Sequence, residues 1–304
     1  MFIAYLFSVI AIFFFSTVEI AGKLIDSEIS PLNITVYRFL IGSIFLLIPA
    51  IMQIRKKRIR LQLKDFWTMA IPGILNIAIS MYILQLAIYY GKALVVAIIM
   101  SSNSIFVSIF AKLLLKEKIS KYRAIGMVLG ILGMIIVVIG NRGGDLSPAK
   151  NMPLGVFYAV LASITFGLFT VLAKKNTHRY GAVAFNCISF IIGALVLFVF
   201  ALIFKADITF TPNTNNLLGL LYLGLLVTGL SYVLYAKGLE KIDASMPAML
   251  FLLKPIFASL LAVIFLKETF SIYQAQGVLL ILFGLSLEQI VKTLSAKKLR
   301  SQEI

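Results

Sequence analysis

The chain has 304 residues, of which 61% are hydrophobic and 13% are charged, and its mean hydropathy is +1.02. This composition excludes a soluble globular domain and predicts an integral membrane protein. The formal net charge of +16 would suggest nucleic acid as a partner of a soluble protein. Here the basic residues lie in short loops between apolar runs, where they indicate topology, so we expect a lipid bilayer and no nucleic acid as partner.

About ten apolar runs reach the roughly 20 residues that an α-helix needs to cross a bilayer. The expected fold is therefore all-α, with ten transmembrane helices. We expect the first run to be retained as a span, because Met1-Phe2-Ile3 lacks the basic start of a signal peptide and no small-residue cleavage pattern follows. The expected spans are residues 2–21, 31–52, 66–90, 93–115, 122–140, 153–173, 182–204, 217–239, 244–266 and 273–291.

The basic residues are distributed unevenly between the two sets of loops. If the amino terminus is inside, the inner loops and the tail carry about three times as many Lys and Arg residues as the outer loops. The richest inner segment runs from Arg55 to Lys64. We therefore expect a multi-pass protein of a cytoplasmic (inner) membrane, with both termini in the cytoplasm.

The two halves of the chain repeat one another at a constant offset of 151 residues. The pattern LKExxSxYxxxG begins at Leu115 and again at Leu266. Five spans per copy is an odd number, so the copies must cross the membrane in opposite orientations. Inverted repeats are typical of secondary transporters, whose substrate site lies near mid-membrane where the halves meet. We place the repeats at residues 1–145 and 146–304, with the boundary in the turn-rich segment 141–148. The same offset pairs Lys23 with Lys174, Phe39 with Phe190, Gly42 with Gly193 and Gly133 with Gly284.

Three features together resemble the drug/metabolite transporter superfamily, EamA type. They are the Leu-x-Glu that ends the fourth and ninth spans, the Lys254-Pro255 pair, and the entry to the second span from Pro31 to Arg38-Phe39. The resemblance covers essentially the whole chain and implies a ten-helix carrier of small metabolites with a central cavity. The chain departs from the commoner pattern at Ser104, which stands where the second copy has Pro255, and at Phe15-Ser16, where an aromatic-Gly pair is frequent.

Lys254 is a lone cation near the middle of an apolar run, followed at once by Pro255. A cation at the centre of a membrane helix costs roughly 2.5–3.5 kcal/mol, so it normally faces the bundle interior or a wet cavity. Pro255 removes a backbone donor and opens the helix locally. We expect Lys254 to meet a substrate carboxylate; the alternative is that it only satisfies carbonyls of a neighbouring helix. Asn103 occupies the equivalent position in the first copy, so both should project toward the same centre.

Glu19 and Arg38 are the other charged candidates within the spans. One hypothesis pairs Glu19 with Arg38 as a structural ion pair across the hairpin at residues 26–31. The other makes Glu19 a proton or cation site, because intramembrane acids often mark proton relays.

Polar side chains of three further spans complete the candidate cavity. Small Ser residues can instead let helices approach and hydrogen-bond at about 0.6 kcal/mol each, but for the segment from Ser101 to Ser104 we favour a cavity. The candidates are Asn76 and Ser80 in the third span, Ser101, Asn103 and Ser104 in the fourth, and Thr228, Ser231 and Tyr232 in the eighth.

The acids of the repeated Leu-x-Glu motif, Glu117 and Glu268, have a structural explanation. Ser271 and Gln274 have the spacing of a capping box that begins the tenth helix, and Glu268 just before it favours that positive helix end. We do not expect either acid to bind substrate.

The function that we expect is secondary transport of a small polar metabolite such as an amino acid, as an exporter whose coupling ion could be the proton. An organic cation or amine bound by Glu19 is the competing substrate class. An ATP-driven pump is disfavoured because no phosphate-binding loop is present. A lone His178 and a lone Cys187 argue against a metal site. We expect no enzyme activity and no cofactor, although a membrane-embedded lipid-handling enzyme and an ion channel are the weaker alternatives. We expect a monomer or a weak dimer.

Overall fold

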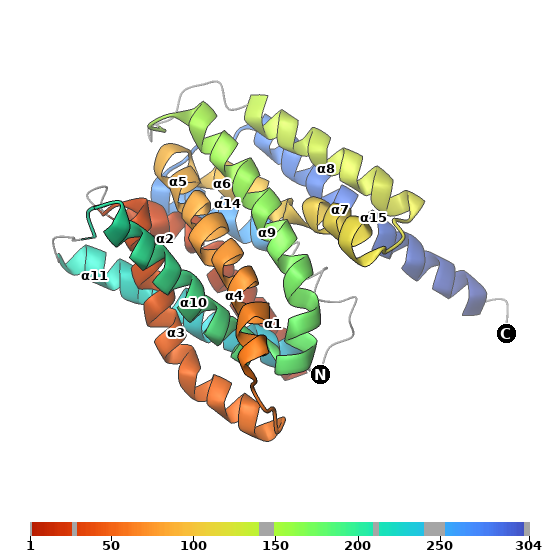
Figure 1. The fold of residues 1–304 in the computed structure, drawn as a ribbon. Coiled ribbons are helices and arrows are strands. Elements are labelled where there is room, and N and C mark those ends of the chain that lie inside the picture. The colour runs from red at the N-terminus through yellow and green to blue at the C-terminus, as the bar shows by residue number, and fades with distance from the viewer. Residues whose placement is uncertain (1, 26–28, 140–148, 209–212, 240–252, 301–304) are drawn as a thin grey trace.

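The computed structural model describes residues 2–25, 29–139, 149–208, 213–239 and 253–300, and every regular element within these ranges is a helix (Figure 1). Eight helical runs are long and apolar enough to cross a membrane, and the shorter apolar helices Leu253–Leu266 and Ile272–Glu288 occupy the ninth and tenth positions. The expected all-α membrane fold with ten spans is confirmed. Residues 244–252 of the ninth expected span lie outside the described residues, as does the boundary expected at residues 145 and 146, which stays a prediction.

Five of the spans are single helices and five contain more than one element or begin beside an undescribed segment. The single helices are α3 (Pro31–Lys56), α8 (Lys121–Ile139), α9 (Met152–Tyr180), α10 (Ala182–Ile203) and α15 (Ile272–Arg300). The others are α1 (Phe2–Ser16) with α2 (Val18–Leu24), α4 (Leu63–Gly73) with η1 (Ile74–Met81) and α5 (Tyr82–Tyr90), α6 (Ala93–Ser101) with α7 (Asn103–Leu115), α11 (Thr214–Leu221) with η2 (Tyr222–Leu230) and α12 (Ser231–Leu239), and α14 (Leu253–Leu266).

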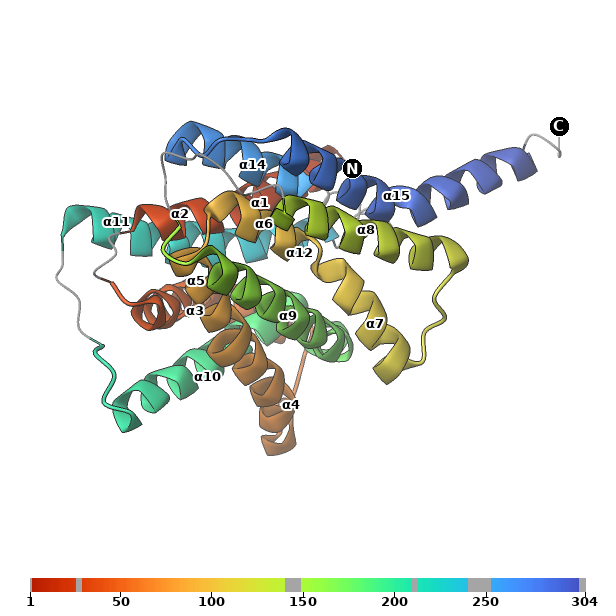
Figure 2. The same cartoon turned by 90° about the horizontal axis from the view of Figure 1, so that it is seen from above.

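Close glycine contacts between α8 and α15 show that the repeats are inverted. These helices are the fifth spans of the two copies and lie side by side (Figures 1 and 2). Gly126 abuts the backbone of Gly284, and Gly133 abuts that of Gly277, so neither position has room for a Cβ. As the chain advances from 126 to 133 on one helix it retreats from 284 to 277 on the other. Equivalent helices therefore run antiparallel.

A second symmetric set of contacts joins the second span of each repeat to the third span of the other. Gly42 on α3 abuts Gly224 on η2, and Gly193 on α10 abuts Gly73 at the end of α4. The offset of 151 residues exchanges these two contacts. Beside each contact the helix widens into a π-helical segment, η1 or η2, and such segments are frequent at functional sites.

The fourth span is interrupted at Ser102, whose φ of −84° and ψ of 5° end α6 and begin α7. No proline is needed, because the hydroxyls of Ser101 and Ser102 bond to the carbonyls four residues back and loosen the turn. The fourth span is therefore broken even though Ser104 stands where the second copy has Pro255.

The loops alternate between two ends of the bundle, which we name the Lys23 end and the Lys174 end after the lysines that lie there. At the Lys23 end the backbone amide of Asn151 donates to the carbonyl of Tyr90 over 3.0 Å, which joins the end of the third span to the start of the sixth. At the Lys174 end the side-chain amide of Asn176 donates to the backbone carbonyl of Thr68 over 2.9 Å. Each end thus carries contacts between the two repeats.

Candidate functional site

Glu19 and Lys254 form an ion pair between the two repeats. Glu19 lies in the first turn of α2, after the break that Thr17 makes in the first span. Lys254 lies on α14 beside the buried Pro255. Lys254 Nζ is 3.3 Å from Glu19 Oε1, and the exposed fractions of the two side chains are 14% and 0%. The other carboxylate oxygen, Oε2, is buried and has no hydrogen-bond partner among the described residues. The two charges that we expected to act separately are therefore neighbours.

Arg38 does not form the ion pair that one hypothesis gave it with Glu19. Its Nε donates to Thr228 Oγ1 on η2 over 2.9 Å, and its guanidinium carbon lies 4.9 Å from the ring centroid of Phe39. Arg38 is buried and also interacts electrostatically with Tyr232 and Glu19. Glu19 is thus paired with Lys254, while Arg38 stays nearby as a second buried cation.

The candidate Tyr232 and three rings that sequence reasoning did not assign to the site form a continuous packed row beside these charges. The ring of Tyr232 packs edge-on against Phe15 at 5.1 Å and against Phe190 at 5.0 Å between centroids. Phe190 in turn packs on Phe39 at 5.1 Å. Phe39 and Phe190 are equivalent positions of the two repeats, so their contact marks the pseudo-twofold axis. The constant offset was the signal that could have placed them there.

The Ser candidates with an assigned bond use their hydroxyls within the helical scaffold. Ser80 donates to the carbonyl of Ala162 on α9, Ser101 to that of Ala97, and Ser231 to that of Leu226 in the wide turn of η2. These bonds fit the packing alternative that we considered for small polar residues.

Asn76, Ser104 and Asn103 differ from these serines. Asn76 in η1 is fully buried, and neither its amide nitrogen nor its amide oxygen has a partner among the described residues. The Ser104 hydroxyl is also buried and has no partner in the part of the chain that the structure describes, and Asn103 is half-buried at the start of α7. A buried amide without partners costs free energy, so these groups are suited to binding water or a ligand.

The Leu-x-Glu acids lie at opposite ends of the bundle in different environments. Glu268 Oε1 and Oε2 accept hydrogen bonds from the amides of Ala93 and Leu94, each over 2.9 Å, so this carboxylate caps α6 rather than the tenth helix. The expected capping box of Ser271 and Gln274 is present and begins α15. Burial raises the pKa of Glu268, although the two amides and nearby lysines act in the opposite direction. Glu117 instead accepts from Lys174 Nζ over 2.6 Å.

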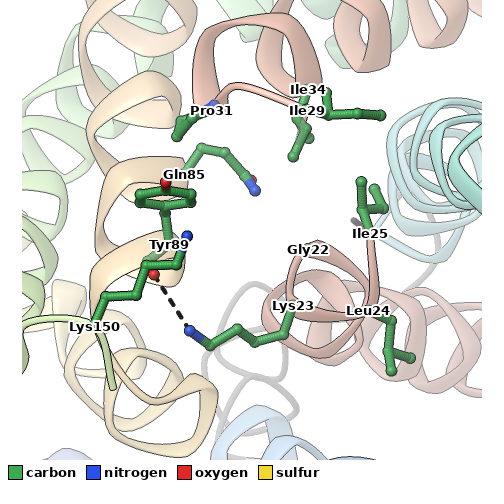
Figure 3. Close-up of a pocket in the computed structure, with 10 residues that line it drawn as sticks. All are labelled: Gly22, Lys23, Leu24, Ile25, Ile29, Pro31, Ile34, Gln85, Tyr89 and Lys150. Carbon is green, nitrogen blue, oxygen red and sulfur yellow. Dashed lines mark hydrogen bonds between the residues drawn. The ribbon is translucent and has the colours of Figure 1, made fainter. Parts of the chain in front are cut away.

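A cavity of about 360 Å³ lies at the Lys23 end, between α2, the start of α3 and α5 (Figure 3). The ammonium of Lys23 reaches the carbonyl of Tyr89 over 3.4 Å, and Lys150 Nζ lies 3.5 Å from the centroid of the Tyr89 ring. The side-chain amide of Gln85 points across the cavity toward Gly22 (Figure 3). The lining is Gly22, Lys23, Leu24, Ile25, Ile29, Pro31, Ile34, Gln85, Tyr89 and Lys150.

Comparisons with known proteins agree with this architecture. The model of the EamA-like transporter family matches residues 2–139 and again residues 153–287. An uncharacterized transporter of Clostridium kluyveri is 32% identical over 290 residues, which cover 92% of this chain and 91% of the relative. The uncharacterized transporter YoaV of Bacillus subtilis is 26% identical over 266 residues, covering 88% and 89%. A solved crystal structure superposes with a TM-score of 0.67 over 95% of this chain and 96% of the other at 17% identity, which shows a shared fold alone.

Proposed function

This chain belongs to the EamA-like transporter family, and from that premise we propose that it exports a small zwitterionic metabolite, such as an amino acid, by alternating access. The substrate would bind between Glu19 and Lys254, beside the pseudo-twofold axis. Substrate sites at the interface of inverted repeats are general among secondary transporters.

The observation that carries this proposal is the ion pair of Glu19 with Lys254. A zwitterion carries one carboxylate and one ammonium, so it can neutralise both protein charges when the pair opens. A plain amine or a plain carboxylate would leave one buried charge without a partner, and breaking a buried pair in that way costs about 3–5 kcal/mol. The cost of opening the pair therefore discriminates in favour of zwitterions.

The neighbours of the pair fit the rest of such a substrate. The rings of Phe15 and Tyr232 offer an apolar surface, and Arg38 with Thr228 holds a second positive charge in place nearby. That second cation favours ligands with a carboxylate over simple amines.

A second candidate is an organic cation or amine bound by Glu19 alone. The buried and unpaired Oε2 of Glu19 favours it, because this oxygen could accept from an ammonium group while Lys254 keeps Oε1. The two candidates differ in whether a substrate carboxylate is required.

The proposed direction follows from competition at Glu19. A proton and a substrate ammonium both neutralise this carboxylate, so they would bind alternately and be exchanged across the membrane. Proton entry from outside would then drive export. The excess of Lys and Arg at the Lys174 end supports placing that end in the cytoplasm and the Lys23 end outside.

A ligand series that differs only in charge tests the proposal. Purified protein is heated with an amino acid such as leucine, with its decarboxylated amine 3-methylbutylamine, and with its deaminated acid 4-methylpentanoate, and the series is repeated for other side chains. A ligand that binds only the native state at about 100 times its Kd stabilises it by about 2.7 kcal/mol. We expect stabilisation by one or more zwitterions and by neither of their single-charge analogues.

Variants assign that binding to the pair. Glu19→Gln and Lys254→Met should each abolish the ligand-induced shift, whereas Glu288→Gln, which removes an acid from the separate pair with Arg123, should leave it intact. Equal stabilisation by the amine would support the cation candidate. A zwitterion that still stabilises both pair variants would contradict the proposed site.

A further inference from the structure

Two repeat-related Lys–Glu combinations stand at opposite ends of the bundle. The offset of 151 residues converts Lys23 into Lys174 and Glu117 into Glu268. In each combination the lysine lies near the end of the apolar first span of one repeat, and the glutamate follows the fourth span of the other. Each combination therefore bridges the two repeats at one mouth of the bundle.

The two combinations are in different states. Lys174 Nζ lies 2.6 Å from Glu117 Oε1, and their side chains are 58% and 37% exposed. Lys23 interacts with Glu268 electrostatically but forms no ion pair with it. Instead its ammonium extends beside the cavity and bonds to the carbonyl of Tyr89 (Figure 3). The symmetry of the sequence is thus broken in the structure at the two mouths.

We propose that these two combinations are the gates of the transporter, and that each ion pair forms at the mouth that is closed and separates at the mouth that is open. The proposal rests on the alternating-access function proposed above. In an inverted-repeat transporter the opposite-facing state arises when the two repeats exchange conformations around the site. Lys23 and Glu268 must then take the geometry that Lys174 and Glu117 have here, and the latter pair must separate.

Glu268 is the fixed half of the gate at the Lys23 end. Its two bonds to the amides of Ala93 and Leu94 hold it at the start of α6. A carboxylate has about four acceptor sites, so it can keep these bonds and still receive an ammonium. Lys23 is the moving half, because leaving Tyr89 for Glu268 withdraws its side chain from the lining of the cavity. Lys150 also faces Lys23 and repels it from the cavity side.

Distances between spin labels at each mouth measure the gates without substrate. One pair of labels is placed at Leu24 and Phe270, which are exposed neighbours of Lys23 and Glu268, and the other pair at Lys118 and His178. The native Cys187 is buried and is replaced by serine in the labelled protein.

Lys174→Met and Lys23→Met should shift the populations in opposite directions. Lys174→Met removes an exposed ion pair, so it should open the Lys174 mouth more often and change the ratio of the two states by roughly twofold to fivefold. Lys23→Met should open the Lys23 mouth more often. Arg123→Met removes a separate ion pair at the Lys174 end and should change neither distance distribution.

Charge exchange separates a gate from a packing contact. Lys174→Glu places like charges at that mouth and should open it, and adding Glu117→Lys should restore the original distribution. Shifts in the same direction for both methionine variants, unchanged distributions, or no restoration by the exchange would overturn the proposal. Because counterflow transport tests alternating access itself, counterflow with unmoved populations would reject these gates and leave the transport function standing.

Discussion

Removing one charge of the Glu19–Lys254 pair should destabilise the protein far more than removing both. Glu19 is fully buried and Lys254 is only 14% exposed on its side chain. Lys254→Met keeps the apolar bulk of the side chain but leaves the carboxylate buried without its cation, at a cost of about 3–5 kcal/mol. Glu19→Gln leaves the ammonium in the same position. The double variant removes both charges and should be close to the wild type.

The assay is a double-mutant cycle on apparent melting temperature in one detergent. At about 2–4 °C per kcal/mol, each single variant should melt roughly 6–20 °C lower than the wild type. The double variant should recover most of that loss. If it matches the wild type, the coupling energy is about 6–10 kcal/mol in magnitude, which is the sum of the two single losses and exceeds the usual range for residues in contact. Additive effects of the two substitutions would refute the pair as a buried, coupled unit.

Three further predictions concern topology, packing and pH. Reporter fusions at Arg58 and at the carboxyl tail should both score cytoplasmic and a fusion at Asp207 should score outside; a cytoplasmic Asp207 would contradict the proposed orientation. Gly126→Ala should lower the free energy of unfolding by about 1–3 kcal/mol, because the new Cβ would clash with a backbone carbonyl of α15. Gly22→Ala should cost much less, because the nearest atoms there are side chains at 3.1 Å or more. Equal melting temperatures of the two variants would refute the packing argument. Burial raises the pKa of Glu268 above 4.5 in the folded protein, so its contribution to stability is fullest below its unfolded pKa and declines as pH rises through its folded pKa. The melting temperature of the wild type minus that of Glu268→Gln should therefore fall with rising pH. A difference that rises with pH would show that the folded pKa of Glu268 is lowered instead.

Much of the fold could be predicted from the sequence, because its causes are local or periodic. Apolar length determined the spans, and the constant offset with an odd number of spans determined the inversion that the contacts of Gly126 and Gly133 then show. The break at Ser102 was harder to foresee, since serine hydroxyls compete for helix carbonyls without a proline to mark the place. The two π-helical segments had no recognised sequence signal.

The site was predictable in its members but less so in their partners. Lys254 and Glu19 were recognisable because charges inside apolar spans are costly, yet their pairing depends on how the first and ninth spans pack. The same reason explains why Glu268 caps α6 rather than the helix that follows it in sequence. Spacing along one helix identifies a face, whereas contacts between repeats depend on tertiary packing.

Counterflow in proteoliposomes tests the central claim of a carrier with Lys254 in its substrate site most directly. Vesicles are loaded with a high concentration of the unlabelled zwitterion that stabilises the protein, and uptake of the same labelled compound is followed without any ion gradient. A carrier predicts a transient accumulation of label above its equilibrium level, retained in Glu288→Gln and lost in Lys254→Met. Label that rises only to equilibrium in the wild type would contradict alternating access, and an undiminished overshoot in Lys254→Met would remove this residue from the substrate site.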